Sequence, residues 1–100
     1  MVNQVILIGK LTNKPILKKR EDKVYSKVTL ATPRNYKNIN GEYDTDFIDV
    51  VLINKVAESC IEYCKQGDIV GVRGNLQRSK DKDLEVYAEK ITFLSSKSHK

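Results

Sequence analysis

The stretch that decides the fold is Asp46-Phe-Ile-Asp-Val-Val-Leu-Ile-Asn-Lys55, which reads as a strand that runs into the start of a helix. Strand side chains alternate between two faces, so Ile48, Val50 and Leu52 share one face, which we expect to be a core face. The opposite face carries the other four side chains: Phe47, Asp49, Val51 and Ile53. An outer face this apolar predicts that the strand is covered by another subunit or holds a flat ligand.

The rest of the chain supplies four more strand signals and one helix signal. Together with 46–55, we expect strands at 4–11, 24–32, 68–78 and 84–94. Apolar residues at helical spacing predict a helix over 55–66, with Asn54 as its N-cap and Gly67 as its C-cap. Five strands with a helix between the third and fourth is the order of the OB-fold, an all-β, five-stranded Greek-key barrel. The domain is expected to span 1–95, with 96–100 a short disordered basic tail.

Composition narrows the choice of function. The chain has 100 residues, enough for one domain, and a net charge of +5 with a pI of about 9.2. A basic domain favours nucleic acid or an anionic membrane as partner, although a soluble protein that happens to be basic fits the charge as well. The sequence has no apolar run of about 20 residues and no secretory signal, so we expect a cytoplasmic protein that does not enter a membrane.

Residues able to carry chemistry are scarce. The sole histidine, His99, lies near the end of the chain, and carboxylate pairs occur only in expected loops. Cys60 and Cys64 lie one turn apart on the predicted helix and are expected to be small core side chains rather than metal ligands. The sequence therefore predicts no enzyme, no metal and no cofactor.

A binding signal is present between the second and third strands. Arg34, Tyr36 and Lys37 follow Pro33 on an expected loop, and Asn40-Gly41 predicts a tight turn. Cations that alternate with a ring suit single-stranded nucleic acid, because cations pair with phosphates and a ring stacks on a base.

Several motifs, taken in order, resemble the bacterial single-stranded DNA-binding protein family. They are Asn3-Gln-Val-Ile-Leu-Ile-Gly-Lys-Leu11 with Pro15, Val28-Thr-Leu-Ala-Thr32, Asp46-Phe-Ile-Asp-Val-Val-Leu52, Lys55-Val-Ala-Glu58, Val72-Arg-Gly-Asn-Leu76 and Glu85-Val-Tyr-Ala-Glu-Lys-Ile-Thr-Phe-Leu94. The resemblance implies an OB-fold protomer that binds single strands without sequence preference in DNA replication, recombination or repair. It also implies a homotetramer, or a dimer, built through the first strand, with Asn3, Val5 and Leu7 at the interface.

The resemblance also implies site residues. Tyr36 and Phe47 occupy positions of base-stacking rings, and Ile53 stands where the family usually has another ring. Basic positions of the binding path fall at or near Lys55, Lys65, Arg73 and Lys80. With the loop residues, the expected single-stranded DNA contacts are Arg34, Tyr36, Lys37, Phe47, Ile53, Lys55, Arg73, Arg78 and Lys80.

Three departures from the family pattern change what is expected. Ile53 cannot stack, and Asp49 puts a negative charge on the binding face, so both should weaken affinity. The connection 79–83 is shorter than the usual hairpin arm and lacks its ring. The long tail with an acidic tip is missing, so tail-mediated recruitment of repair proteins is not expected. The alternatives are a dimeric adaptor of replication restart that resembles primosomal replication protein N, and a barrel dimer with a purely structural role.

Overall fold

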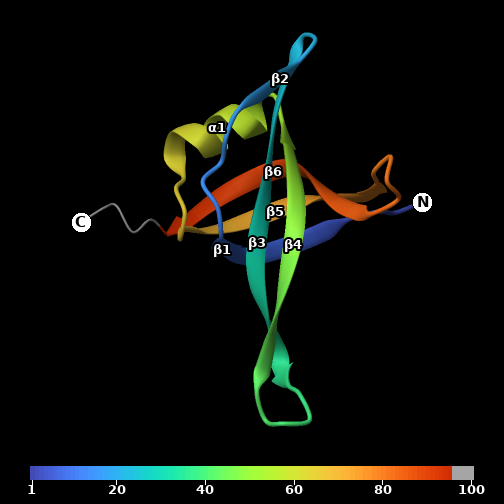
Figure 1. Ribbon diagram of the computed structural model, residues 1–100, viewed down its shortest axis with the longest axis vertical. Coiled ribbons are helices and arrows are strands. Elements are labelled where there is room, and N and C mark those ends of the chain that lie inside the picture. Colours follow the sequence, from blue (N-terminus) through green and yellow to red (C-terminus); the bar gives the residue numbers. More distant parts are fainter. Residues whose placement is uncertain (96–100) are drawn as a thin grey trace.

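Two long strands, β3 (Lys23–Lys37) and β4 (Tyr43–Ile53), run the length of the molecule and cross the other principal strands, as seen in a computed structural model that describes residues 1–95 (Figure 1). The remaining elements are β1 (Val5–Leu11), β2 (Lys18–Arg20), α1 (Lys55–Tyr63), β5 (Ile69–Arg78) and β6 (Leu84–Ser95). The sheet order is β1-β5-β6-β4-β3-β2, with β1 also pairing with β3 through Lys10 and Leu11. That second pairing closes the sheet into a barrel, and the predicted OB-fold is confirmed.

The strand pairings are antiparallel except one. β4 and β6 run parallel and meet at Val50–Val86 and Val51–Tyr87. This short contact joins the β3–β4 pair to the β1–β5–β6 group, so the barrel is mixed. It also places β6 beside β4 in the sheet, so side chains of both strands share the outer face.

The core follows the alternation expected of the strands. Val50 and Leu52 are fully buried, and Ile48 packs partly against them, as the 46–55 pattern predicts. The fully buried apolar side chains on the other strands and the helix include Leu11, Val28, Leu30, Val70, Val72, Ala57 and Cys60. Close backbone contact at two glycines tightens the barrel: a Cβ on Gly9 would lie 2.7 Å from Thr32 Oγ1, and one on Gly74 would overlap the Tyr87 carbonyl.

The helix is shorter than predicted. It ends at Tyr63, because Cys64 is already extended, so the prediction of a helix to residue 66 is wrong by one turn. Asn54 precedes the helix as expected but makes no side-chain cap; its φ of 56° shows that it serves as a left-handed turn residue. The C-cap is Cys64, so the prediction of Gly67 as the C-cap is wrong; Gly67 has a positive φ, of 96°, in the turn that follows the helix. Its N–H donates to the Leu11 carbonyl at 2.8 Å and ties this turn to β1.

Two segments differ from the sequence-based prediction. Residues 18–20 form β2, which pairs with β3, whereas the sequence-based prediction has no strand there. Residues 34–37 are strand rather than loop, because β3 and β4 continue as a hairpin beyond the barrel. The predicted turn at Asn40-Gly41 lies at the tip of this hairpin. Asn38 organises it, since its Oδ1 accepts hydrogen bonds from the N–H groups of Asn40 and Glu42. We call residues 33–46 the arm.

Within residues 1–95, no helix is both long enough and apolar enough to cross a membrane. Residues 96–100, where a disordered basic tail was predicted, lie outside the described residues.

Candidate nucleic-acid interface

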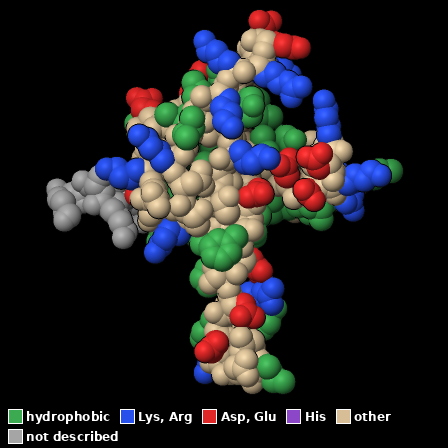
Figure 2. Space-filling model, in the orientation of Figure 1, with side chains coloured by type: hydrophobic (Ala, Val, Ile, Leu, Met, Phe, Trp, Pro, Cys, Tyr) green, Lys and Arg blue, Asp and Glu red, His purple; other side chains and the backbone are tan. Residues whose placement is uncertain are grey.

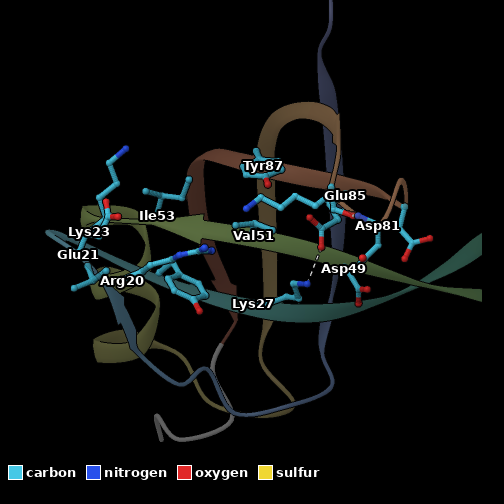
Figure 3. Close-up of a pocket in the computed structure, with 15 residues that line it drawn as sticks. Arg20, Glu21, Lys23, Lys27, Asp49, Val51, Ile53, Asp81, Glu85 and Tyr87 are labelled. Carbon is cyan, nitrogen blue, oxygen red and sulfur yellow. Dashed lines mark hydrogen bonds and ion pairs between the residues drawn. The ribbon is translucent and has the colours of Figure 1, made fainter.

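A groove of about 550 Å³ lies over the outer face of β3 and β4 and is bounded by the β2–β3 and β5–β6 hairpins. Its floor is set by strand register. Tyr25 lies directly across from Ile53, and Lys27 lies across from Val51. On the other side of β4, Val51 pairs with Tyr87. Side chains from three strands therefore point into one hollow, which is the surface that the apolar outer face of 46–55 predicts (Figure 3).

An ion pair crosses the middle of the groove. Lys27 Nζ lies 2.7 Å from Glu85 Oε2, and the two side chains point toward one another in Figure 3. The Glu85 side chain is only 8% exposed, whereas that of Lys27 is 54% exposed. The hydrogen bond to Glu85 raises the pKa of Lys27 above its usual value, even though burial acts in the opposite direction. Lys27 is therefore committed to a nearly buried carboxylate.

Asp49, which has the wrong sign for DNA, lies in this groove next to the ion pair. Its Oδ1 accepts a hydrogen bond of 2.9 Å from Thr29 Oγ1, the residue opposite it on β3. Its charge also contributes to raising the pKa of Lys27. Asp49 is therefore held beside a cation, so its negative charge is partly balanced.

The groove lining carries slightly more negative than positive charge. Four cations line it, namely Arg20, Lys23, Lys27 and Lys80. Five carboxylates do so too, namely Glu21, Asp49, Asp81, Asp83 and Glu85. In Figure 2, acidic side chains gather where the β5–β6 hairpin meets the body, with basic side chains around them. Phosphates have no electrostatic reason to enter the middle of this groove, whereas uncharged bases face no such barrier.

The arm carries a second set of predicted residues. Arg34 makes two hydrogen bonds of 3.0 Å to Asp46, through Nε and Nη2, and lies 3.9 Å from Asp44. These contacts raise the pKa of Arg34 and lower that of Asp46, chiefly through the hydrogen bonds between the two groups. Arg34 is thus occupied by carboxylates of its own hairpin rather than free, a contact that the sequence-based prediction did not include.

Tyr36 on the arm and Phe47 at its base lie on different faces. Phe47 is 67% exposed and pairs with Ala31, on the same face as the groove. Arg34 bonds Asp46, the neighbour of Phe47, and therefore belongs to the opposite face. Tyr36 lies under Arg34, with the guanidinium 6.0 Å from the ring centre. The structure therefore does not bring Tyr36 and Phe47 together on one platform.

The other predicted contacts are distributed unevenly. Ile53 and Lys80 line the groove, and Lys55 begins the helix just beyond Ile53. Arg78 donates from Nη1 to the Lys82 carbonyl in the β5–β6 turn. Arg73 lines a different hollow, of about 330 Å³, on the β1–β5–β6 face. Lys37 lies at the arm tip, 5.9 Å from the centre of the Tyr43 ring.

Four residues of the groove floor and its central ion pair were absent from the predicted site. Tyr25 and Lys27 had a signal in the sequence, because alternation places them on the outward face of the second predicted strand. Tyr87 enters the groove only because β6 pairs in parallel with β4, and such a long-range contact leaves no local pattern. Glu85 was missed for the same reason.

Residues 1–95 contain no group of three or more histidine, cysteine or carboxylate side chains able to hold a metal. Cys60 and Cys64 are buried and unpaired, in agreement with their predicted role in the core. Burial raises the pKa of the Cys60 thiol to about 12, so it stays protonated and unreactive near neutral pH.

The barrel, its grooved outer face and the projecting arm define an OB-fold binding module. The model of the single-strand binding protein family matches residues 2–94. The chain is 40% identical to a single-stranded DNA-binding protein of Caldanaerobacter subterraneus subsp. tengcongensis, over 98% of this chain and 71% of that protein. It is 37% identical to single-stranded DNA-binding protein B of Bacillus subtilis, over 97% of this chain and 94% of the relative.

The chain therefore belongs to the single-strand binding protein family. This is the family predicted from the motifs. It is a family of binding proteins, which agrees with the prediction that the chain is not an enzyme.

Proposed function

We propose that the protein binds single-stranded DNA without sequence preference, with bases in the groove of β3 and β4 and phosphates on cations around its rim. The observation that carries the proposal is a groove whose floor is apolar and aromatic, with Tyr25 and Tyr87 among its residues, on a basic barrel of this family. Base–aromatic stacking is tolerant of sequence because every base has a π-face. Contacts between the protein's cations and the phosphates of the DNA then supply affinity without selecting a sequence.

Within this proposal, Phe47 stacks a base and Ile53 covers one beside it. Phe47 is exposed on the groove face of β4 at the base of the arm, so its ring is accessible to a base. Lys55, Lys80 and other surface cations that form no ion pair within residues 1–95 neutralise phosphates. Arg34 contributes only when a phosphate displaces Asp46, because the two are paired in the free protein. Such binding would serve DNA replication, recombination or repair.

Titration of labelled oligo-dT by fluorescence anisotropy at several salt concentrations tests the function directly. If roughly five phosphates are neutralised per protomer, log affinity should fall with log salt at a slope of about −3.5. Duplex DNA of the same length is the control and should bind more weakly, because its bases are not available for stacking. No binding of oligo-dT at low salt would refute the proposal.

We further propose that the protein assembles through β1, as a homotetramer or a dimer. β1 pairs with β5 along Val5–Lys10 but with β3 only at its end, which leaves one edge open for pairing with a second copy. Ile6 and Ile8 are 69% and 58% exposed on this strand. The predicted interface residues Val5 and Leu7 pack against the core, and Asn3 exchanges two hydrogen bonds with the Leu76 backbone. In such an assembly, Asn3, Val5 and Leu7 would contribute mainly by holding β1 in place, so that its backbone can pair with the second copy.

Analytical ultracentrifugation measures the assembly. A tetramer supports the plain single-strand binder, whereas a stable dimer that also binds a restart helicase would favour the adaptor. Ile6→Lys and Ile8→Lys place charges on the exposed side of β1 and should shift the oligomer toward monomer. A variant that sediments like the wild type would exclude this side of β1 from the interface.

A further inference from the structure

A row of three side chains crosses the β2 end of the groove. Tyr25 is the register partner of Lys18 on β2 and of Ile53 on β4. Residues directly opposite each other in antiparallel strands point to the same face, so Lys18, Tyr25 and Ile53 form one continuous row. Ile53 is apolar but cannot stack, and the ring that it lacks is present one strand away.

Tyr25 is placed to present this ring to a base. It is partly buried and lines the groove, and its cross-strand neighbour Ile53 is apolar. Tyr87 approaches the same floor from β6, beside Val51. Apolar neighbours on the groove floor already restrict the motion of a ring. Little further conformational entropy of the side chain is therefore lost when a base stacks on it.

β2 supplies cations beside Tyr25. Lys18 and Arg20 are two residues apart on this strand and thus share the face of Tyr25, and Arg20 lines the groove. Both are exposed, and within residues 1–95 neither forms an ion pair. Lys27 is different, because it is paired with Glu85. Cations beside an accessible ring match the requirements of a single-stranded nucleic acid.

We propose that Tyr25 stacks a base and that Lys18 and Arg20 bind the adjoining phosphates, so that β2 extends the interface past Ile53. This inference rests on the proposed single-stranded DNA binding. The base that would otherwise lie over Ile53 would then stack on Tyr25 of the neighbouring strand, and β2 would take part in binding.

Tyr25→Trp is the most direct test, because the protein has no tryptophan and the new indole reports on its own surroundings. Oligo-dT is titrated while the anisotropy of labelled DNA and the tryptophan emission are followed together. We expect near wild-type affinity with strong quenching of the emission. Normal binding with unchanged emission would overturn the proposal, because the ring would then lie off the path of the strand.

Tyr25→Leu keeps an apolar side chain but removes stacking, and it should weaken binding by roughly 5- to 150-fold. Thermal melting checks that the variant is folded; if it is not, the Tyr25→Trp result decides.

Lys18→Gln should reduce the magnitude of the salt slope by about 0.7. Lys19→Gln is its matched control, because Lys19 pairs with Val24 and points to the other face. Equal effects of the two lysine variants would overturn the role given to β2.

The wild-type protein and Phe47→Ala separate the two levels of inference. If the wild type does not bind oligo-dT, the proposed function fails and this inference fails with it. If the wild type binds, Phe47→Ala binds weakly and Tyr25→Leu binds normally, only the assignment of Tyr25 is refuted.

Discussion

β3 and β4 form two different structures along their length. Inside the barrel, one face of the pair is core and the other is groove, so Val28, Leu30, Val50 and Leu52 are almost completely buried. Beyond the barrel the same strands form the arm, which projects from the body in Figure 2. Most of its side chains are exposed, and polar contacts such as Arg34–Asp46 and Asn38–Asp44 link its strands. The two regions share backbone pairing but differ in what stabilises it.

The difference has energetic consequences. Burying a Val or Leu side chain stabilises a fold by roughly 1.5–3 kcal/mol, so the barrel part of the pair is held firmly. Exposed ion pairs such as Arg34–Asp46 contribute little, because water solvates both charges well. A region with few buried apolar contacts opens most easily. The arm is thus the part of the pair that can rearrange around a ligand, whereas the groove floor is fixed in advance.

The largest expected effect tests the barrel against the arm at two glycines. A Cβ on Gly74 would overlap the Tyr87 carbonyl, so Gly74→Ala should reduce the free energy of unfolding by about 3 kcal/mol or more. Gly41, at the arm tip, has no atom within 4 Å of its Cβ position and a φ of 79°, so Gly41→Ala should cost only about 1 kcal/mol. Urea denaturation measures both. Equal losses of unfolding free energy would mean that the arm tip tolerates an added side chain no better than the barrel does.

Next in size is the contribution of Phe47, where the two regions meet. Phe47→Ala removes an exposed ring and should weaken oligo-dT binding by roughly 1–3 kcal/mol, because stacking is lost. Ile53→Ala removes an aliphatic side chain and should cost less. Anisotropy titrations of both variants at one salt concentration give the comparison, with thermal melting as the folding control. A larger loss at Ile53 would show that the floor, rather than the base of the arm, dominates binding.

The ion pair in the groove should matter for stability. Lys27→Met leaves Glu85 nearly buried without its partner, and should destabilise the protein by about 1–2 kcal/mol, since water can reach the site from the exposed side of Lys27. The double variant Lys27→Met/Glu85→Gln removes both charges and should recover most of this loss. Urea denaturation of the single and double variants measures the coupling. Additive losses would show that the two residues do not stabilise one another.

The sequence predicts the barrel well because its signals are local. Alternation along 46–55 identified the buried face of β4, and turn residues such as Asn40-Gly41 identified the arm tip. β2 was missed because its three charged residues form a strand only through pairing with β3. The continuation of β3 through Pro33 was also missed, since proline usually ends a strand but is tolerated where strand pairing is interrupted by a bulge.

The site was predicted less completely than the fold, for a physical reason. Position in a motif indicated Phe47, Ile53 and Lys80, but it could not show that Arg34 is occupied by Asp46 or that Arg73 lies on another face. Both facts depend on side chains that meet only after the strands pair. Tyr87 and Glu85 belong to the same class, because parallel pairing between β4 and β6 brings them to the groove.

The smallest expected effect concerns the arm alone. Asp46→Asn preserves the shape of residue 46 but removes its charge, so Arg34 becomes available to a phosphate. Oligo-dT should bind a few-fold more tightly, and the salt slope should steepen by about 0.7, the contribution of one single-strand phosphate. Asp44→Asn removes an equal charge but leaves the two hydrogen bonds between Arg34 and Asp46 in place, so its slope should stay near that of the wild type.

The pH dependence of the same pair gives an independent measurement. Arg34 holds the pKa of Asp46 below its usual value, so Asp46 has a lower pKa in the folded than in the unfolded state. The stability that the pair contributes is therefore present above the unfolded pKa of about 3.9, and it is lost as the pH falls through the folded pKa. NMR titration of the Asp46 carboxyl should show this lowered pKa, and Arg34→Gln should return it toward the usual value. If the carboxyl titrates normally in the wild type, Arg34 is already free in solution, and the arm then offers it to DNA without first breaking a contact.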